Sequence, residues 1–463
     1  MKKYLTTFLL AFSFSFANAQ QIEGLWNGTL KIPGGQIDVI FTITQKDNVY
    51  RASMDIPAQN VKGLAASSVL LNEKKVTISL DLIGSVYVGE VTNDSTLNGE
   101  WKQNGMKLPL VLTKGLAVKT ASNRTQTPKA PFPYEEREVT FENKKAGISL
   151  SGTLTVPNGN GKFPAVILVS GSGPQNRDSE IFGHKPFAVL ADYLGRNGIA
   201  VLRYDERGVG KSGGDFSKAT TYDFAEDAAA AIEFLKKEPK ADINKIGLIG
   251  HSEGGLVGPI VATSDKRPSF LVLLAAPAVN IDELMLEQAR LTSEIRGASQ
   301  EMIKLQVETN AKAFALIKSG PITDTVMREV EDVFVSQLTV LAKGTMSEDA
   351  IRKQAQQVTR QTFTPWFVEF IKWRPKENLE KLSGPVLALY GSRDLQVSAK
   401  QNLPALREIL TKNPKVQLTI EELQGLNHLF QTAPTGNIAE YGKIEETFSP
   451  IALKKIADWI LLR

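Results

Sequence analysis

The pattern of hydrophobic and polar positions changes character near residue 134. Between residues 22 and 113, short and partly alternating apolar runs, such as 37–43, 76–80 and 108–112, are separated by turns containing Gly, Asn and Asp. Alternation with a period of two is typical of strands with one buried face. We expect about eight antiparallel strands here, forming a small barrel or sandwich.

Beyond residue 134, apolar strand-like runs alternate with helical patterns. A β-hairpin is expected over 136–157, and amphipathic helices are expected over stretches such as 222–237 and 451–462. This alternation predicts an α/β fold with a mainly parallel sheet and helices on both faces. The expected strands of that sheet are 165–170, 199–204, 245–249, 270–275, 385–390 and 416–421.

Residues 114–133 separate the two patterned regions. They are rich in Lys, Thr, Ala and Pro, a composition typical of a linker. We therefore expect an all-β domain over 20–113 and an α/β domain over 134–463. A long, charge-rich helical stretch separates the last two expected strands from the others, and ordinary connections are much shorter. This stretch predicts an inserted helical cap at about 280–375, over the strand ends where such sheets bind ligands.

The first residues have the features of a secretory signal peptide. Lys2 and Lys3 precede an apolar run from Leu5 to Phe16, and Ala17-Asn18-Ala19 fits a cleavage site before Gln20. The apolar run is too short to span a bilayer. We expect the first 19 residues to be removed, leaving a secreted or periplasmic protein without a membrane span.

Composition excludes several classes of site. The chain has no cysteine, which excludes disulfides and thiolate metal sites. Its 54 basic and 50 acidic residues nearly balance and form no basic cluster, so nothing indicates a nucleic-acid partner. The histidines, His184, His251 and His428, are too few and too scattered for a histidine-rich metal site. We expect neither a metal nor a cofactor.

The most specific motif is Gly250-His251-Ser252-Glu253-Gly254, which follows strand 245–249 directly and leads into a helical pattern. A serine hydroxyl is a weak nucleophile unless a sharp strand-to-helix turn holds it beside a base, and so tight a turn requires the two flanking glycines. A second Gly-x-Ser-x-Gly match, at 210–214, lies in a glycine-rich loop with no strand immediately before it. We therefore interpret Ser252 as the nucleophile and Ser212 as part of the loop structure.

The sharp turn at Ser252 is a nucleophile elbow. Together with three further motifs, which occur in the order used by the family, it resembles the α/β-hydrolase superfamily, in particular its serine aminopeptidase-like and carboxylesterase branch with a helical cap. The resemblance covers about residues 134–463. The family's acid follows a late strand, where this chain has Asp394, and its base follows one strand later, where this chain has His428. The resemblance thus implies a catalytic triad of Ser252, Asp394 and His428. Asp282 occupies the alternative acid position used by some members of the fold.

An oxyanion hole needs two backbone N–H donors aimed at the developing charge. One should be the N–H of Glu253, directly after the nucleophile. The other should come from the loop 171–178, from either Ser172 or Gly173. That loop is not a dinucleotide-binding fingerprint, because Asn176 stands where the third glycine belongs.

The segment 204–212 resembles the family's Asp-x-Arg-Gly-x-Gly-x-Ser loop. We expect Asp205 and Arg207 to form structural salt bridges that support the elbow. The ending Gly210-Lys211-Ser212 does not make a phosphate-binding loop, because Asp205 stands where that motif needs its first glycine.

The segment 364–373 concentrates four aromatic residues within the expected cap. Packing of the cap explains them, or else Trp366, Phe367 and Phe370 line an apolar acyl pocket that faces Ser252.

The function that these residues favour is an exported serine hydrolase that cleaves carboxylic esters through an acyl-enzyme. One alternative is an aminopeptidase or amidase, in which a cap carboxylate such as Glu369 binds the substrate amine. Another is an inert binding protein whose β-domain captures its ligand. The expected partner is a small-molecule ester or amide.

Overall fold

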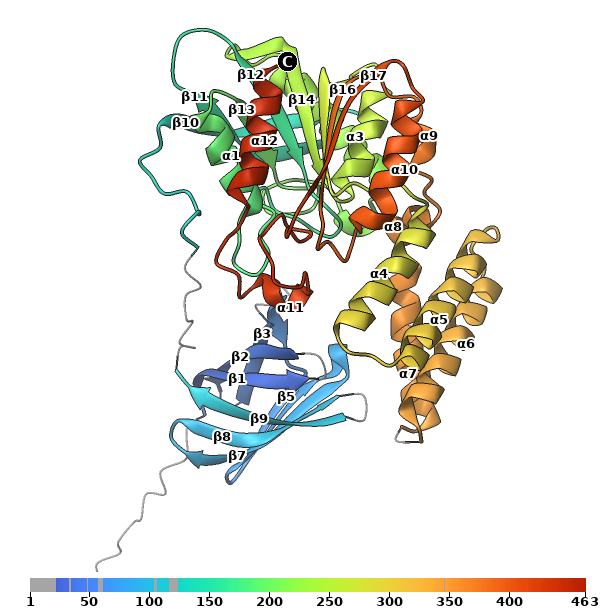
Figure 1. Cartoon of the computed structure of the whole chain (residues 1–463). Coiled ribbons are helices and arrows are strands. Elements are labelled where there is room, and N and C mark those ends of the chain that lie inside the picture. The colour runs from blue at the N-terminus through green and yellow to red at the C-terminus, as the bar shows by residue number, and fades with distance from the viewer. Residues whose placement is uncertain are drawn as a thin grey trace, which may run out of the picture. The chain divides into compact units, whose positions relative to one another are not determined.

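The computed structural model describes residues 22–32, 35–47, 49–56, 61–103, 106–115, 124–344 and 346–463. They form two compact units, the first ending at residue 115 and the second beginning at residue 124 (Figure 1). The expected signal peptide, residues 1–19, lies outside the described residues, as does part of the expected linker.

The first unit is an antiparallel sheet, which confirms the expected all-β class. In the described residues the strand order is β4-β3-β2-β1-β9-β8-β7-β6-β5, with one short 3-10 turn at Asp81–Ile83. The strands are β1 Gly24–Ile32, β2 Gly35–Lys46, β3 Val49–Ile56, β4 Val61–Ala65, β5 Ser68–Asn72, β6 Lys75–Leu80, β7 Ser85–Asn93, β8 Thr96–Gln103 and β9 Met106–Lys114.

The two edge strands of this sheet are consecutive in the chain, so the sheet curls until its edges approach each other. The N–H of Ala66 donates to the carbonyl of Ala52 on β3, and the N–H of Ser67 donates to that of Ser79 on β6, each at 2.8 Å. One side chain in two along the strands points into a shared core that includes Trp26, Phe41, Tyr87 and Trp101.

The second unit contains a mixed sheet in the order β10-β11-β13-β12-β14-β15-β16-β17. β10 and β11 form the expected antiparallel hairpin, and β11 pairs antiparallel with β13. The other six strands, β12 to β17, run parallel to one another. All six expected strands are present. The strands are β10 Tyr134–Asn143, β11 Ile148–Pro157, β12 Phe163–Val169, β13 Ala200–Tyr204, β14 Ala241–His251, β15 Phe270–Leu274, β16 Gly384–Gly391 and β17 Val416–Leu423.

Helices cover this sheet, with α1 and α12 on one side and α3 and α10 on the other (Figure 1). The inner parallel strands are buried on both faces and therefore read as continuous apolar runs, such as 246–249 in β14. The helices of the second unit outside the cap are α1 Pro186–Arg196, α2 Thr221–Leu235, α3 Gly254–Ala262, α9 Lys376–Leu379, α10 Ala399–Thr411, α11 Ile438–Tyr441 and α12 Pro450–Leu461, with a 3-10 turn at Phe216–Lys218.

In the described part of the chain, six helices lie between β15 and β16, and the first five of them form the expected helical cap. Four of them begin at an N-cap hydroxyl, on Ser299, Thr323, Ser347 or Thr364, which accepts a hydrogen bond from a backbone N–H three residues later. The cap helices are α4 Ile281–Ile295, α5 Gln300–Lys318, α6 Asp324–Ala342, α7 Glu348–Thr362 and α8 Pro365–Ile371.

Within the described part of the chain, we find no helix that combines the length and the apolar content needed to cross a membrane.

Candidate active site

Ser252 lies at the tip of a sharp turn between β14 and α3. Its φ of 55° falls in the left-handed region, which is uncommon for a residue with a side chain and typical of a strained functional turn. A Cβ on Gly250 would lie 2.1 Å from the carbonyl oxygen of Gly254, and one on Gly254 would lie 2.2 Å from that of Val169. Both flanking positions therefore require glycine, as the motif predicts.

Asp394 and His428 are brought together from the ends of β16 and β17. The Nδ1–H of His428 donates to Asp394 Oδ2 at 2.8 Å. The other carboxylate oxygen, Oδ1, accepts the backbone N–H groups of Gln396 and Val397 at 2.8 and 2.9 Å. Because Nδ1 carries the proton, Nε2 is left with a lone pair and can accept a proton.

Asp282, the alternative acid, lies in the first turn of cap helix α4. Its carboxylate forms ion pairs with Lys318 and with Arg374, the latter at 3.2 Å. The structure thus places Asp282 among cap residues and places Asp394 against His428.

His251 connects the elbow to the loop that carries His428. Its Nε2–H donates to the backbone carbonyl of His428 at 2.8 Å, and the two imidazole rings lie 4.8 Å apart. Burial, together with repulsion from His428, lowers the pKa of His251 to about 4. His251 is therefore neutral near pH 7 and acts as a hydrogen-bond donor, a role that its place in the motif does not indicate.

A buried polar network holds the loop after β17. Asn427 Oδ1 accepts the N–H groups of Leu429 and Gln431, each at 3.0 Å. His184 lies beneath this loop with its Nε2 2.9 Å from the carbonyl oxygen of Tyr441, and burial lowers its pKa to about 4. His184 thus has a structural role that joins segments far apart in the sequence.

The loop after β12 passes close to Ser252 at Gly171. A Cβ on Gly171 would lie 3.0 Å from the Cβ of Ser252. The sequence predicts Ser172 or Gly173 as the donor and does not point to Gly171. The signal for it is the pair Ser170-Gly171 at the end of an expected strand. The assignment of the second oxyanion donor stays a prediction.

Glu253, whose N–H is the other candidate donor, is the N-cap residue of α3 and is 2% exposed. Its Oε1 accepts hydrogen bonds from the hydroxyl of Thr221 at 2.6 Å and from the indole N–H of Trp366 at 2.8 Å. Burial raises the pKa of this carboxyl, against the effect of its hydrogen bonds. The motif predicts a role for the backbone N–H of Glu253, whereas these side-chain contacts follow from tertiary packing.

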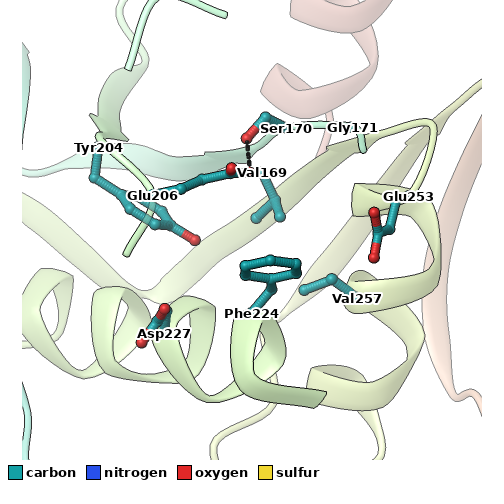
Figure 2. A pocket seen from close by; sticks show the side chains of 9 residues that line it. All are labelled: Val169, Ser170, Gly171, Tyr204, Glu206, Phe224, Asp227, Glu253 and Val257. Carbon is teal, nitrogen blue, oxygen red and sulfur yellow. Dashed lines mark hydrogen bonds between the residues drawn. The ribbon is translucent and has the colours of Figure 1, made fainter. Parts of the chain in front are cut away.

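Glu253 and Glu206 lie on the wall of the same cavity, whose volume of about 10 Å³ suits a single water molecule (Figure 2). Glu206 accepts hydrogen bonds from the Ser170 hydroxyl at 2.6 Å and from the Gln175 N–H at 2.9 Å, so it braces the loop that contains Gly171. Burial raises the pKa of Glu206 to about 8.

The loop 204–212 forms the expected salt bridges. Asp205 pairs with Arg177 at 2.8 Å, and Arg207 pairs with Asp227 on α2 at 2.7 Å. The hydroxyl of Ser212 donates to the carbonyl of Asp205 at 2.6 Å, which fits a structural role for this serine.

The three candidate pocket residues lie on α8. Trp366 stacks on Phe370 with ring centroids 4.8 Å apart, Phe370 is buried in the core, and Phe367 packs 6.0 Å from Phe314 of α5. Trp366 is also tied to Glu253, the residue after Ser252. That these rings line an acyl pocket stays a prediction.

These features define an α/β-hydrolase fold with a serine at its nucleophile elbow. Residues 184–432, more than half of the chain, match the family described as serine aminopeptidase, S33, and the chain belongs to this family.

Esterase EstD of Thermotoga maritima is 28% identical over 299 residues, which are 65% of this chain, and the chain spans 61% of the length of that relative. Thiohydrolase aneE of Aspergillus aculeatus is 26% identical over 254 residues, 54% of this chain and 74% of the relative. Among solved structures, the Pyrococcus furiosus esterase Pf2001 has a TM-score of 0.41 at 17% identity, covering 72% of this chain and 96% of that one.

Proposed function

We propose that this protein is a serine hydrolase that cleaves carboxylic esters through an acyl-enzyme. The observation that carries the proposal is the hydrogen bond between His428 and Asp394. Both residues follow the C-terminal ends of parallel strands, as does the strained turn at Ser252. An imidazole held by a buried carboxylate, together with a serine at a nucleophile elbow, is suited to acyl transfer.

In the proposed reaction, Ser252 Oγ attacks the ester carbonyl while His428 Nε2 takes the hydroxyl proton. Backbone N–H groups, one of them from Glu253, stabilise the oxyanion that forms. The tetrahedral intermediate collapses, the alcohol leaves with the proton from His428, and an ester to Ser252 remains. Water then attacks this acyl group, His428 again takes and returns a proton, and the acid is released. Asp394 stabilises the imidazolium in both halves.

The curated relatives support an acyl substrate, since one is named an esterase and another a thiohydrolase. The family description also names aminopeptidases, which favours amide cleavage as a second candidate. Glu369, the cap carboxylate considered for amine binding, is exposed on α8. We further propose export through the N-terminal signal peptide, so that the mature protein isolated from the cell envelope or the medium begins at Gln20.

The test compares two serines in Gly-x-Ser-x-Gly sequences. Ser252→Ala should lose ester turnover by a factor on the order of 10⁴ to 10⁶ in kcat and should no longer react with a fluorophosphonate. Ser212→Ala should keep both properties. Retained turnover in Ser252→Ala would overturn the proposal, and a panel of esters and aminoacyl anilides on the wild-type protein decides between ester and amide substrates.

A further inference from the structure

The carboxyl group of Glu253 joins three parts of the second unit at one buried point. Thr221 contributes its hydroxyl from the first turn of α2, and Trp366 contributes its indole N–H from the first turn of the cap helix α8. The other carboxyl oxygen, Oε2, is buried and has no hydrogen-bond partner among the described residues. The backbone of the same residue leads directly from Ser252 into α3.

These partners are uncharged donors. A buried carboxyl that accepts hydrogen bonds from neutral groups is held for its geometry rather than for an ion pair. Two donors converge on the single atom Oε1, so the direction of the side chain, and with it the backbone at the start of α3, is fixed from outside the elbow.

Trp366 is itself firmly held within the cap. Its ring stacks on Phe370 one helical turn later, with an interplanar angle of 20°, and Phe370 is 5% exposed. Thr364 caps the helix and fixes where it begins, because its hydroxyl accepts the N–H of Phe367 at 3.2 Å. A displacement of α8 would therefore move the indole N–H away from Glu253.

We propose that the Glu253 side chain is a positioning residue that orients its own backbone N–H for the oxyanion and makes this orientation depend on the docking of α8 through Trp366. The inference rests on the proposed function, since it assumes acyl transfer at Ser252. A misplacement of about 1 Å in a reacting group can cost about 100-fold in rate, so small shifts at Glu253 are sufficient.

The experiment measures kcat and KM on one small chromogenic ester. Trp366→Phe keeps an aromatic ring but removes the N–H, and we expect about tenfold lower kcat with little change in KM. Glu253→Met removes both acceptors at similar side-chain length, and we expect a fall of about 10- to 100-fold in kcat. Glu253→Gln keeps a carbonyl oxygen for both donors and should retain kcat within about threefold.

Two controls separate positioning from damage to the fold. Trp373→Phe alters another cap-region tryptophan, whose ring packs 4.8 Å from that of Tyr222, and should leave kcat unchanged. In the double variant Glu253→Met/Trp366→Phe, the second change should cost nothing further, because Trp366 acts through Glu253. The inhibition constant of a trifluoromethyl ketone, which forms an oxyanion on Ser252, should rise with the fall in kcat while KM does not.

Wild-type kcat in both Trp366→Phe and Glu253→Met, additive losses in the double variant, a change confined to KM, or an inactive Glu253→Gln would each overturn the inference. These outcomes are distinct from failure of the proposed function. The proposed function fails if Ser252→Ala keeps its turnover. If Ser252→Ala is inactive while Trp366→Phe and Glu253→Met are fully active, only the role of the Glu253 side chain is overturned.

Discussion

At the scale of single residues, the two aspartates considered for the acid differ in their surroundings. Asp394 is buried against His428, and Asp282 is paired with cap cations. Asp394→Asn should leave the fold intact but stabilise the wrong imidazole tautomer, lowering kcat by about 10⁴. Asp282→Asn should change kcat by less than about tenfold. Steady-state kinetics at saturating ester measures both, and the reverse order would move the acid to Asp282.

Glu206 provides a pH test of the folded state. Its pKa rises from 4.5 to about 8 on burial, so between these values the folded protein holds a proton that the unfolded chain has released. The free energy of unfolding contributed by this group is therefore present at low pH and lost as the pH rises toward 8.

Glu206→Gln cannot lose this proton. Its amide can accept the N–H of Gln175 and donate to the hydroxyl of Ser170, so the variant keeps both contacts. Urea unfolding from pH 5 to pH 8 should show the variant gaining stability relative to the wild type as the pH rises. The exposed substitution Glu329→Gln should show no such trend, and a constant difference between Glu206→Gln and wild type would contradict the expectation.

Some residues around the site can be predicted from a short stretch of sequence, and others cannot. Gly250, Ser252 and Gly254 lie within one pentapeptide, and their spacing alone predicts the turn that the structure shows. Other contacts join residues far apart in the chain. Trp366 donates to Glu253 across 113 positions, and His251 donates to the carbonyl of His428 across 177 positions. Such contacts follow from the packing of distant elements, and no periodicity in the sequence specifies them.

At the scale of elements, the backbone of α3 passes close to that of β12 where the helix leaves the elbow. Gly254→Ala would place a Cβ 2.2 Å from the carbonyl oxygen of Val169 and 2.8 Å from that of Ser170. Because these are backbone atoms of β12 and its loop, the elbow must shift. We expect marked destabilisation in urea and loss of ester turnover.

Gly258→Ala is the matched control in the same helix. Its Cβ would meet only the ends of leucine side chains, Leu248 at 3.2 Å and Leu271 and Leu273 at 3.6 Å. Alanine also favours a helix over glycine by about 1 kcal/mol. We expect stability within about 1 kcal/mol of wild type and unchanged kcat. Equal effects of the two substitutions would show that the close approach at Gly254 is not what holds the elbow.

The positions of the strands and of the cap in the second unit can be predicted from the sequence. Buried parallel strands appear in it as apolar runs, and the cap appears as an unusually long insertion between two strands. The closure of the first unit does not follow in the same way. It depends on Ala66 and Ser67 joining the two edge strands and bonding to β3 and β6, a pairing set by the curvature of the whole sheet.

At the scale of the whole molecule, the two units have separate hydrophobic cores, and Ser252, Asp394 and His428 all belong to the second. Residues 124–126 also belong to it. Arg124 Nη2 donates to the carbonyl of Gly442 at 2.7 Å, and Gln126 Oε1 accepts the N–H of Thr447 at 2.6 Å. Two truncations, 124–463 and 134–463, therefore differ in whether these contacts remain.

The chain 124–463 should fold alone and keep kcat/KM on a small ester within about threefold, because its core and its proposed site are complete. The chain 134–463 leaves several backbone groups near 442–448 without partners, at about 1 kcal/mol each, and should unfold at a temperature several degrees lower. Circular dichroism melts and ester kinetics measure both. A well-folded 124–463 without turnover would mean that the β-unit completes the active site, and equal melting temperatures would mean that Arg124 and Gln126 add nothing to the fold.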